Sequence, residues 1–134
     1  MRRVVVTGLG TVSALGLDTA SFWQGLCAGR CGISPLDGEL RERTLIQVGA
    51  LVREFDPAAH FEVKRLDLLD RFSQFALVAA REAVREAGLA FDGELGERTA
   101  IVLGTAMGGK TTEDEAFRQL YGLHQKRFSP FVIP

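Results

Sequence analysis

The sequence predicts a layered α/β fold, because segments typical of strands and helices alternate along its 134 residues. Their order is strand, helix, strand, long helix, strand, helix. Hydrophobic residues make up 46% of the chain and charged residues 25%, which is the mix of an ordinary globular protein. The length suits one modest domain. We therefore expect residues 1–134 to belong to one domain without an internal boundary.

Two strands and one helix are expected in the first half. Residues 2–6 are mostly β-branched and run into a glycine-rich turn over residues 7–10. Residues 47–52 alternate weakly between apolar and polar side chains. Between these strands, residues 20–28 should form a helix, and residues 30–40 contain the glycine and proline typical of a loop. The helix has cap candidates Asp18 and Thr19, apolar side chains Phe22, Trp23 and Leu26, and a stop at Gly29.

The second half contains the strongest helical pattern, over residues 66–87. Its apolar and small side chains recur at helical spacing, which predicts burial on more than one side and close approach by a neighbouring backbone. Residues 100–103 should form a buried strand that leads into a glycine loop. A helix is expected over residues 113–121, and residues 129–134 are extended and apolar. The helical set is Leu69, Phe72, Ala76, Ala80, Ala83 and Ala87, the stop is Gly88, and the caps of the last helix are Thr111 or Thr112.

Composition and charge exclude several classes of function. Sixteen basic side chains oppose seventeen acidic ones, so the net charge is −1, and no basic stripe for nucleic acid is present. No apolar run is long enough to span a membrane, which predicts a cytoplasmic protein. Cys27, Cys31, His60 and His124 have no metal-ligand or redox spacing. We expect packing cysteines, solvated histidines, and neither a metal nor a cofactor.

One glycine-rich segment matches the letter pattern of a phosphate-binding P-loop. Gly104 is followed by four residues and then by Gly109-Lys110-Thr111. A P-loop site also needs an aspartate that holds magnesium at the end of another apolar strand, and none is found here. The missing aspartate counts against a P-loop, whereas the letter pattern supports one. A P-loop nucleotide-binding module is thus kept as an alternative function.

A second glycine pair raises a dinucleotide-binding interpretation. Gly8-Leu9-Gly10 follows the first expected strand, but the third glycine of the fingerprint would fall on Ser13. No acidic residue ends a second strand at the expected distance. This interpretation has little support.

Five segments in register resemble the N-terminal portion of a β-ketoacyl-[acyl carrier protein] synthase. They are RRVVVTGLGTVSALG, FWQGLCAGRCGI, LDRFSQFALVAAREAVREAGL, VLGTAMGG and SPFVIP. The resemblance covers essentially the whole chain and implies part of a thiolase-like layered α/β/α/β/α fold. It implies decarboxylative condensation of an acyl thioester with malonyl-carrier protein, by a cysteine, two histidines and a lysine. None of these catalytic residues matches a position in this chain, so we expect residues 1–134 alone to be inactive.

The resemblance also implies substrate and partner contacts. The residue at Met107 would line and gate the acyl tunnel, and Val132 and Ile133 would line the tunnel near the dimer interface. Lys64 and Arg65 would help to dock acyl carrier protein, although Asp67 and Leu68 stand where the family often has basic residues. Expected partners are acyl carrier protein, acyl and malonyl thioesters, and a second subunit in a homodimer or synthase heterodimer. A non-catalytic chain-length partner of a synthase is a further alternative.

Overall fold

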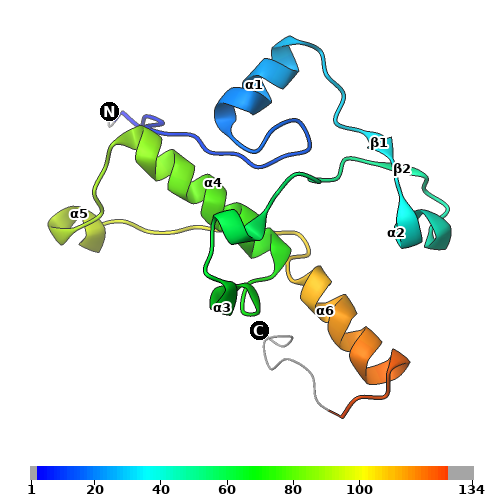
Figure 1. Cartoon of the computed structure of the whole chain (residues 1–134). Helices are drawn as coiled ribbons and strands as arrows, with labels where there is room; N and C mark the ends of the chain where they lie inside the picture. Colours follow the sequence, from blue (N-terminus) through cyan, green and yellow to red (C-terminus); the bar gives the residue numbers. More distant parts are fainter. Residues whose placement is uncertain (1–2, 127–134) are drawn as a thin grey trace. The chain divides into compact units, whose positions relative to one another are not determined.

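The structure, a computed structural model, describes residues 3–126. Contacts divide the chain into two compact units. The first contains the residues up to Asp56 together with Val78–Leu89, and the second contains Pro57–Leu77 together with the residues from Ala90 onward. In chain order the elements are α1 (Thr19–Cys27), β1 (Ser34–Pro35), α2 (Gly38–Arg43), β2 (Val48–Gly49), the 3-10 turn η1 (Pro57–Ala59), α3 (Val63–Leu66), α4 (Arg71–Ala87), α5 (Gly93–Glu97), α6 (Lys110–Phe117) and the π-helical turn η2 (Arg118–Gly122) (Figure 1).

Helix α1 of the first unit forms where the sequence predicts it. Asp18 is its N-cap, and the Asp18 carboxylate accepts a hydrogen bond from the Ser21 backbone N–H at 2.7 Å. The Ser21 hydroxyl completes a capping box. The apolar face of α1 is largely exposed, since Trp23 is 65% exposed and Gly25 is the buried residue of this helix. None of the segments that the structure describes covers that face.

The small sheet of the first unit is an antiparallel pair, with Ser34 opposite Gly49 and Pro35 opposite Val48. Strand β2 lies inside the predicted strand at residues 47–52. Strand β1 and the start of α2 instead occupy part of the expected loop. Leu36, which is buried, packs over Gly49, where a Cβ atom would stand 3.0 Å from a Leu36 methyl group.

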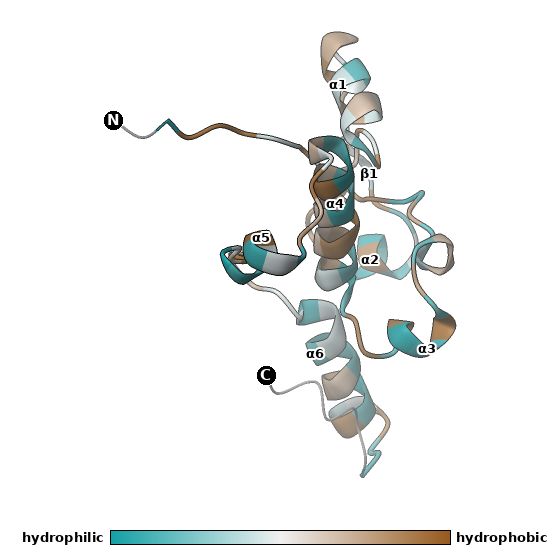
Figure 2. Cartoon of the chain, turned by 90° about the vertical axis from the view of Figure 1, so that its left-hand side faces the viewer, coloured by the Kyte–Doolittle hydropathy of each residue, from teal (hydrophilic) through white to brown (hydrophobic). Residues whose placement is uncertain are grey.

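The strands predicted at residues 2–6 and 100–103 are not formed in the described part of the chain. Residues 3–6 and 100–103 have no sheet partner there. Their side chains are open to solvent, with Val4 and Ile101 each 94% exposed. Figure 2 shows the N-terminal segment as a hydrophobic stretch without regular structure. A strand is stable only when its backbone donors and acceptors pair with a neighbour, and no described segment supplies one.

Helix α4 begins at Arg71 rather than at residue 66. The residues before it form the separate short helix α3, and Asp70 caps the start of α4 by accepting from the Phe72 N–H at 3.1 Å. The helix stops at Gly88, whose φ of 64° fits the predicted glycine stop. Burial on several sides was also expected, but Gln74 is the buried residue of α4.

The last described helix also differs from the prediction. Helix α6 starts at Lys110, and its N-cap is Gly109 with a φ of 83°, in place of Thr111 or Thr112. Helix α5 was not expected from the sequence. The predicted extended segment at residues 129–134 lies outside the described residues. Within residues 3–126, no helix is long and apolar enough to cross a membrane.

Candidate functional site

The glycine loop at residues 104–109 belongs to the second unit and leads directly into α6. Its Gly108 lies against the Phe72 ring of α4. A Cβ atom on Gly108 would stand 2.7 Å from the tip of that ring and 2.9 Å from the Thr105 hydroxyl. A side chain at this position would displace the Phe72 ring or the Thr105 hydroxyl, so glycine allows the close packing seen here.

A carboxylate occupies the start of α6, next to this loop. The Asp70 Oδ2 atom accepts two hydrogen bonds from Thr112, one from its backbone N–H and one from its hydroxyl, each at 2.7 Å. The first backbone N–H groups of a helix are the donors that a P-loop directs at phosphate. At the Thr112 N–H, the protein's own anion takes that place.

The hydrogen bonds favour the ionised form of this carboxylate. Burial raises the pKa of the Asp70 carboxyl, but the bonds from Thr112 and Phe72 outweigh it, so the pKa lies below its ordinary value of 3.8. Asp70 therefore carries a full negative charge at neutral pH. A second anion, such as a nucleotide phosphate, would be repelled from the same helix end.

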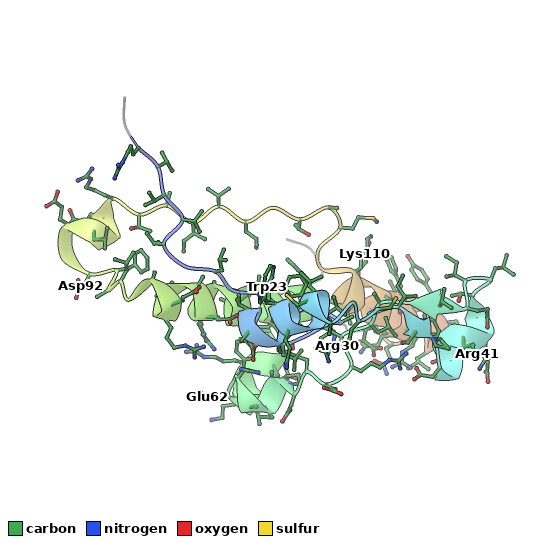
Figure 3. The ribbon with its side chains drawn as sticks, turned by 90° about the horizontal axis from the view of Figure 1, so that it is seen from above. Trp23, Arg30, Arg41, Glu62, Asp92 and Lys110 are labelled. Atoms are coloured by element: carbon green, nitrogen blue, oxygen red, sulfur yellow. The ribbon has the colours of Figure 1, made fainter. Side chains whose placement is uncertain are left out.

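Lys110, the residue that completes the P-loop letter pattern, pairs with an acidic side chain of its own helix. Its ammonium group forms an ion pair with Glu113 in the first turn of α6. Figure 3 shows Lys110 at the start of this helix. The lysine is thus engaged with a carboxylate of the chain, and the α6 N-terminus carries acidic groups that disfavour phosphate.

The second glycine loop, at residues 8–10, belongs to the first unit and lies against α4. A Cβ atom on Gly10 would stand 1.9 Å from the Ala79 carbonyl oxygen, and one on Gly8 would stand 2.1 Å from that of Ala83. The prediction that small residues of this helix allow close approach by a neighbouring backbone is confirmed. These glycines are explained by packing, without a nucleotide.

Carboxylates of α4 also bind the backbone donors of this first loop. Glu86 accepts from the Leu9 N–H. Glu82 accepts from the Thr11 N–H at 3.0 Å and, through its other oxygen, from the Thr19 N–H at 2.7 Å. Donors that a dinucleotide-binding loop would direct at pyrophosphate are satisfied within the chain.

The predicted tunnel residue Met107 lies in the glycine loop, immediately before Gly108, and its side chain is 68% exposed. Val132 and Ile133, the other predicted tunnel residues, lie outside the described residues. The structure therefore places Met107 beside the packed part of the loop. The tunnel contact itself stays a prediction.

The predicted docking residues lie on α3 of the second unit. Lys64 and Arg65 are both exposed. Glu62 and Asp67 stand at the two ends of this short helix as its cap residues. Two basic side chains are therefore bracketed by two acidic ones, so the local net charge of α3 with its caps is close to zero.

The cysteines and histidines do not form a reactive cluster. Cys27 and Cys31 are exposed free thiols, so the expectation of packing cysteines is wrong. The buried residue of α1 is Gly25, and Cys27 at the end of this helix is exposed. His60 and His124 are exposed, as expected. Among residues 3–126 no group of histidine, cysteine and acidic side chains is arranged to hold a metal ion.

Three residues that organise both loops were not predicted from the sequence. Asp70 precedes a strong helical pattern, so the preference of aspartate for N-caps could have identified it as a cap. Its bond to Thr112 spans 42 positions and has no local signal. In the sequence, Glu82 and Glu86 look like ordinary charged residues on the surface of a long helix. Their hydrogen-bond partners lie at residues 9–19, more than 60 positions earlier in the chain.

Comparison with known proteins finds matches that extend over nearly all of the chain. The model of the beta-ketoacyl synthase N-terminal domain matches residues 1–133. The chain is 36% identical to 3-oxoacyl-[acyl-carrier-protein] synthase 2 of Coxiella burnetii and 33% identical to that of Staphylococcus aureus (strain N315), in each case over 99% of this chain and 32% of the relative. It thus spans about a third of the length of the curated relatives it matches.

The structural comparison agrees with the sequence comparison. The solved structure described as the ishigamide ketosynthase/chain length factor matches with a TM-score of 0.79 and 32% sequence identity, over 98% of this chain and 33% of that chain. The predicted thiolase-like α/β fold class is confirmed by this likeness. The chain belongs to the β-ketoacyl synthase family, since the model of that family's N-terminal domain matches residues 1–133.

Proposed function

We propose that the protein containing this domain condenses an acyl thioester with malonyl-[acyl carrier protein] in fatty acid or polyketide synthesis, releasing carbon dioxide. The family match over residues 1–133 is the observation that carries the proposal. The relatives named as 3-oxoacyl-[acyl-carrier-protein] synthase 2 support the same reaction class. The catalytic cysteine and histidines lie outside residues 1–134, so this segment alone is inactive.

In this proposal the glycine loop at residues 104–109 contacts acyl chain rather than phosphate. The occupied donor of Thr112 and the Lys110–Glu113 ion pair support that assignment, because both leave a phosphate without its usual partners. Met107 then lines and gates the tunnel, since a flexible thioether side chain adapts to an irregular apolar ligand. Val132 and Ile133 line the tunnel farther along, near the interface of a dimer.

The proposed partner at α3 is acyl carrier protein, held by Lys64 and Arg65. Both side chains are exposed, which an ionic docking contact with an acidic protein requires. Because Glu62 and Asp67 border these residues, this surface contributes a weak share of the docking energy. Exposed ion pairs typically contribute about 0.2–1 kcal/mol.

A second candidate function is a non-catalytic chain-length partner of a synthase. It is favoured by one observation, the likeness to a solved structure whose description joins a ketosynthase with a chain length factor. Such a subunit would keep the tunnel and the interface but lack the nucleophile. The subunit association is then a heterodimer rather than a homodimer.

A condensation assay on the full-length protein tests the main proposal. The purified protein is incubated with acyl- and malonyl-carrier protein, and the β-ketoacyl product and released carbon dioxide are measured. We expect both products from the protein alone. Activity that appears only when a second synthase subunit is added identifies the chain-length partner. No product in either case, with micromolar binding of magnesium-ATP or magnesium-GTP, contradicts the synthase proposal.

A further inference from the structure

Within the second unit, the single carboxylate of Asp70 caps both the start of α4 and the start of α6. Its Oδ1 atom accepts from the Phe72 N–H at 3.1 Å in the first turn of α4. Its Oδ2 atom accepts from the N–H and the hydroxyl of Thr112, both at 2.7 Å, in the first turn of α6. An N-cap side chain ordinarily serves only its own helix. Here it also supplies the cap that Gly109, at the N-cap position of α6, has no side chain to provide.

The glycine loop is held at a second point by the same turn of α4. The ring of Phe72, two residues after Asp70, packs against Gly108. Asp70 thus fixes the loop where it becomes α6, and Phe72 fixes it one residue after Met107. Both anchors come from the start of one helix.

We propose that Asp70 is a positioning residue for acyl-chain selection, because its bond to Thr112 fixes the backbone that carries Met107. The inference rests on the proposed function, in which Met107 gates the tunnel.

The need for such an anchor follows from the residues between Met107 and α6. Two glycines, Gly108 and Gly109, separate them, and Gly109 has a φ of 83° that other residues rarely adopt. Glycine leaves the backbone wide conformational freedom, so the position of Met107 depends on contacts outside the loop. A gate discriminates between ligands only when its backbone is held in place, since displacements of about 1 Å are enough to change reaction rates strongly.

The variant Asp70→Asn separates this role from ordinary helix capping. Asparagine caps helices about as well as aspartate, but it offers one acceptor oxygen where the carboxylate offers two. It can serve α4 or Thr112, not both. Thr112→Val provides an independent variant, since it removes the hydroxyl donor and keeps the backbone N–H.

Asp18→Asn is the matched control. Asp18 caps only its own helix, α1, through the Ser21 N–H at 2.7 Å. Asparagine keeps one acceptor oxygen for that bond, so the same change of side chain, made in the first unit, should leave acyl-chain selection unchanged.

The experiment compares kcat/KM for octanoyl and palmitoyl primers on carrier protein, using the full-length synthase. We expect Asp70→Asn to bring the ratio of the two kcat/KM values toward one by at least about threefold, because a loosened gate discriminates less. Thr112→Val should shift it in the same direction, and Asp18→Asn should leave it unchanged. Amide hydrogen exchange at residues 104–113 should become about tenfold faster in Asp70→Asn, as for one lost charged hydrogen bond.

Two outcomes overturn the inference in distinguishable ways. If Met107→Ala changes the ratio while Asp70→Asn and Thr112→Val do not, Asp70 has no positioning role and the proposed function stands. If Met107→Ala also leaves the ratio unchanged, the assignment of the gate fails and the inference fails with it. Should Asp70→Asn not fold, Thr112→Val decides by the same criteria.

Discussion

Gly10 lies against Ala79 so closely that a Cβ atom on Gly10 would stand 1.9 Å from the Ala79 carbonyl oxygen. The contact joins the N-terminal loop of the first unit to α4. It gives the Gly8-Leu9-Gly10 motif a packing explanation in place of a nucleotide-binding one. The neighbouring hydrogen bonds from Thr11 and Thr19 to Glu82 reinforce the same contact.

Substitution of Gly10 by alanine should therefore destabilise the protein severely. The added methyl group meets a helix backbone that cannot move aside, and overpacking typically costs about 1–3 kcal/mol and occasionally more. Gly32→Ala is the control, because its Cβ would meet the Ala14 methyl group at 3.2 Å, a contact that small shifts relieve. Thermal unfolding of the full-length variants checks this, and equal melting temperatures for both would contradict the packing explanation.

Removal of the Glu82 carboxylate should loosen the first unit. Glu82→Gln keeps the side-chain length but retains one acceptor oxygen for two backbone donors, those of Thr11 and Thr19. We expect a loss of about 1–3 kcal/mol, the usual cost of an unsatisfied donor. Hydrogen exchange at residues 11–19 provides the measurement, and protection equal to that of the wild type would show that Glu82 is dispensable.

The stabilising effect of Asp70 should depend on pH with a defined sign. Its folded pKa is lowered from the ordinary 3.8, so its contribution is fully present above about pH 4. It is lost as the pH falls through the folded pKa. The melting temperature of the wild type should therefore exceed that of Asp70→Asn at neutral pH, by the equivalent of about 1.5 kcal/mol, the cost of one lost hydrogen bond to a charged group, and the gap should close in acid. A gap that widened below pH 4 would reverse the sign and refute this account.

The isolated segment of residues 1–134 should associate with itself. Side chains such as Val4, Ile101 and Val102 are more than nine-tenths exposed, at 94%, 94% and 93%. Large exposed apolar patches favour association. Sedimentation velocity should show aggregates, whereas a monomer that melts cooperatively would contradict this prediction.

Local signals in the sequence identified the features that depend on neighbours in the chain. The helix at α1, its Asp18 cap and the glycine stop of α4 follow from capping and periodicity, which act within a few residues. The prediction of strands at residues 2–6 and 100–103 was wrong for the described part of the chain. A strand depends on a hydrogen-bonded partner, and these segments do not pair there.

The candidate site also contains residues that the sequence could predict and residues that it could not. Met107 and the glycines of its loop stand out in the sequence, since the motif is contiguous. The carboxylates that occupy the loop donors do not, because Asp70 reaches Thr112 across 42 positions and Glu82 reaches Thr11 across 71. The letter pattern of a P-loop describes spacing alone. Which anion binds its donors depends on contacts that only the folded chain creates.

The central claim is that the loop at residues 104–109 contacts an acyl chain, and the product profile of Met107 variants tests it most directly. Met107→Ala enlarges the tunnel and Met107→Phe narrows it, and a pocket discriminates by about 1–3 kcal/mol per methylene. Lys110→Ala serves as the control in the same full-length protein and should condense normally, because Lys110 pairs with Glu113. The account predicts longer products with Met107→Ala, shorter products with Met107→Phe and an unchanged profile with Lys110→Ala. The account would be contradicted if both Met107 variants gave the product profile of the wild type and the protein bound nucleotide in the micromolar range in a way that Lys110→Ala abolishes.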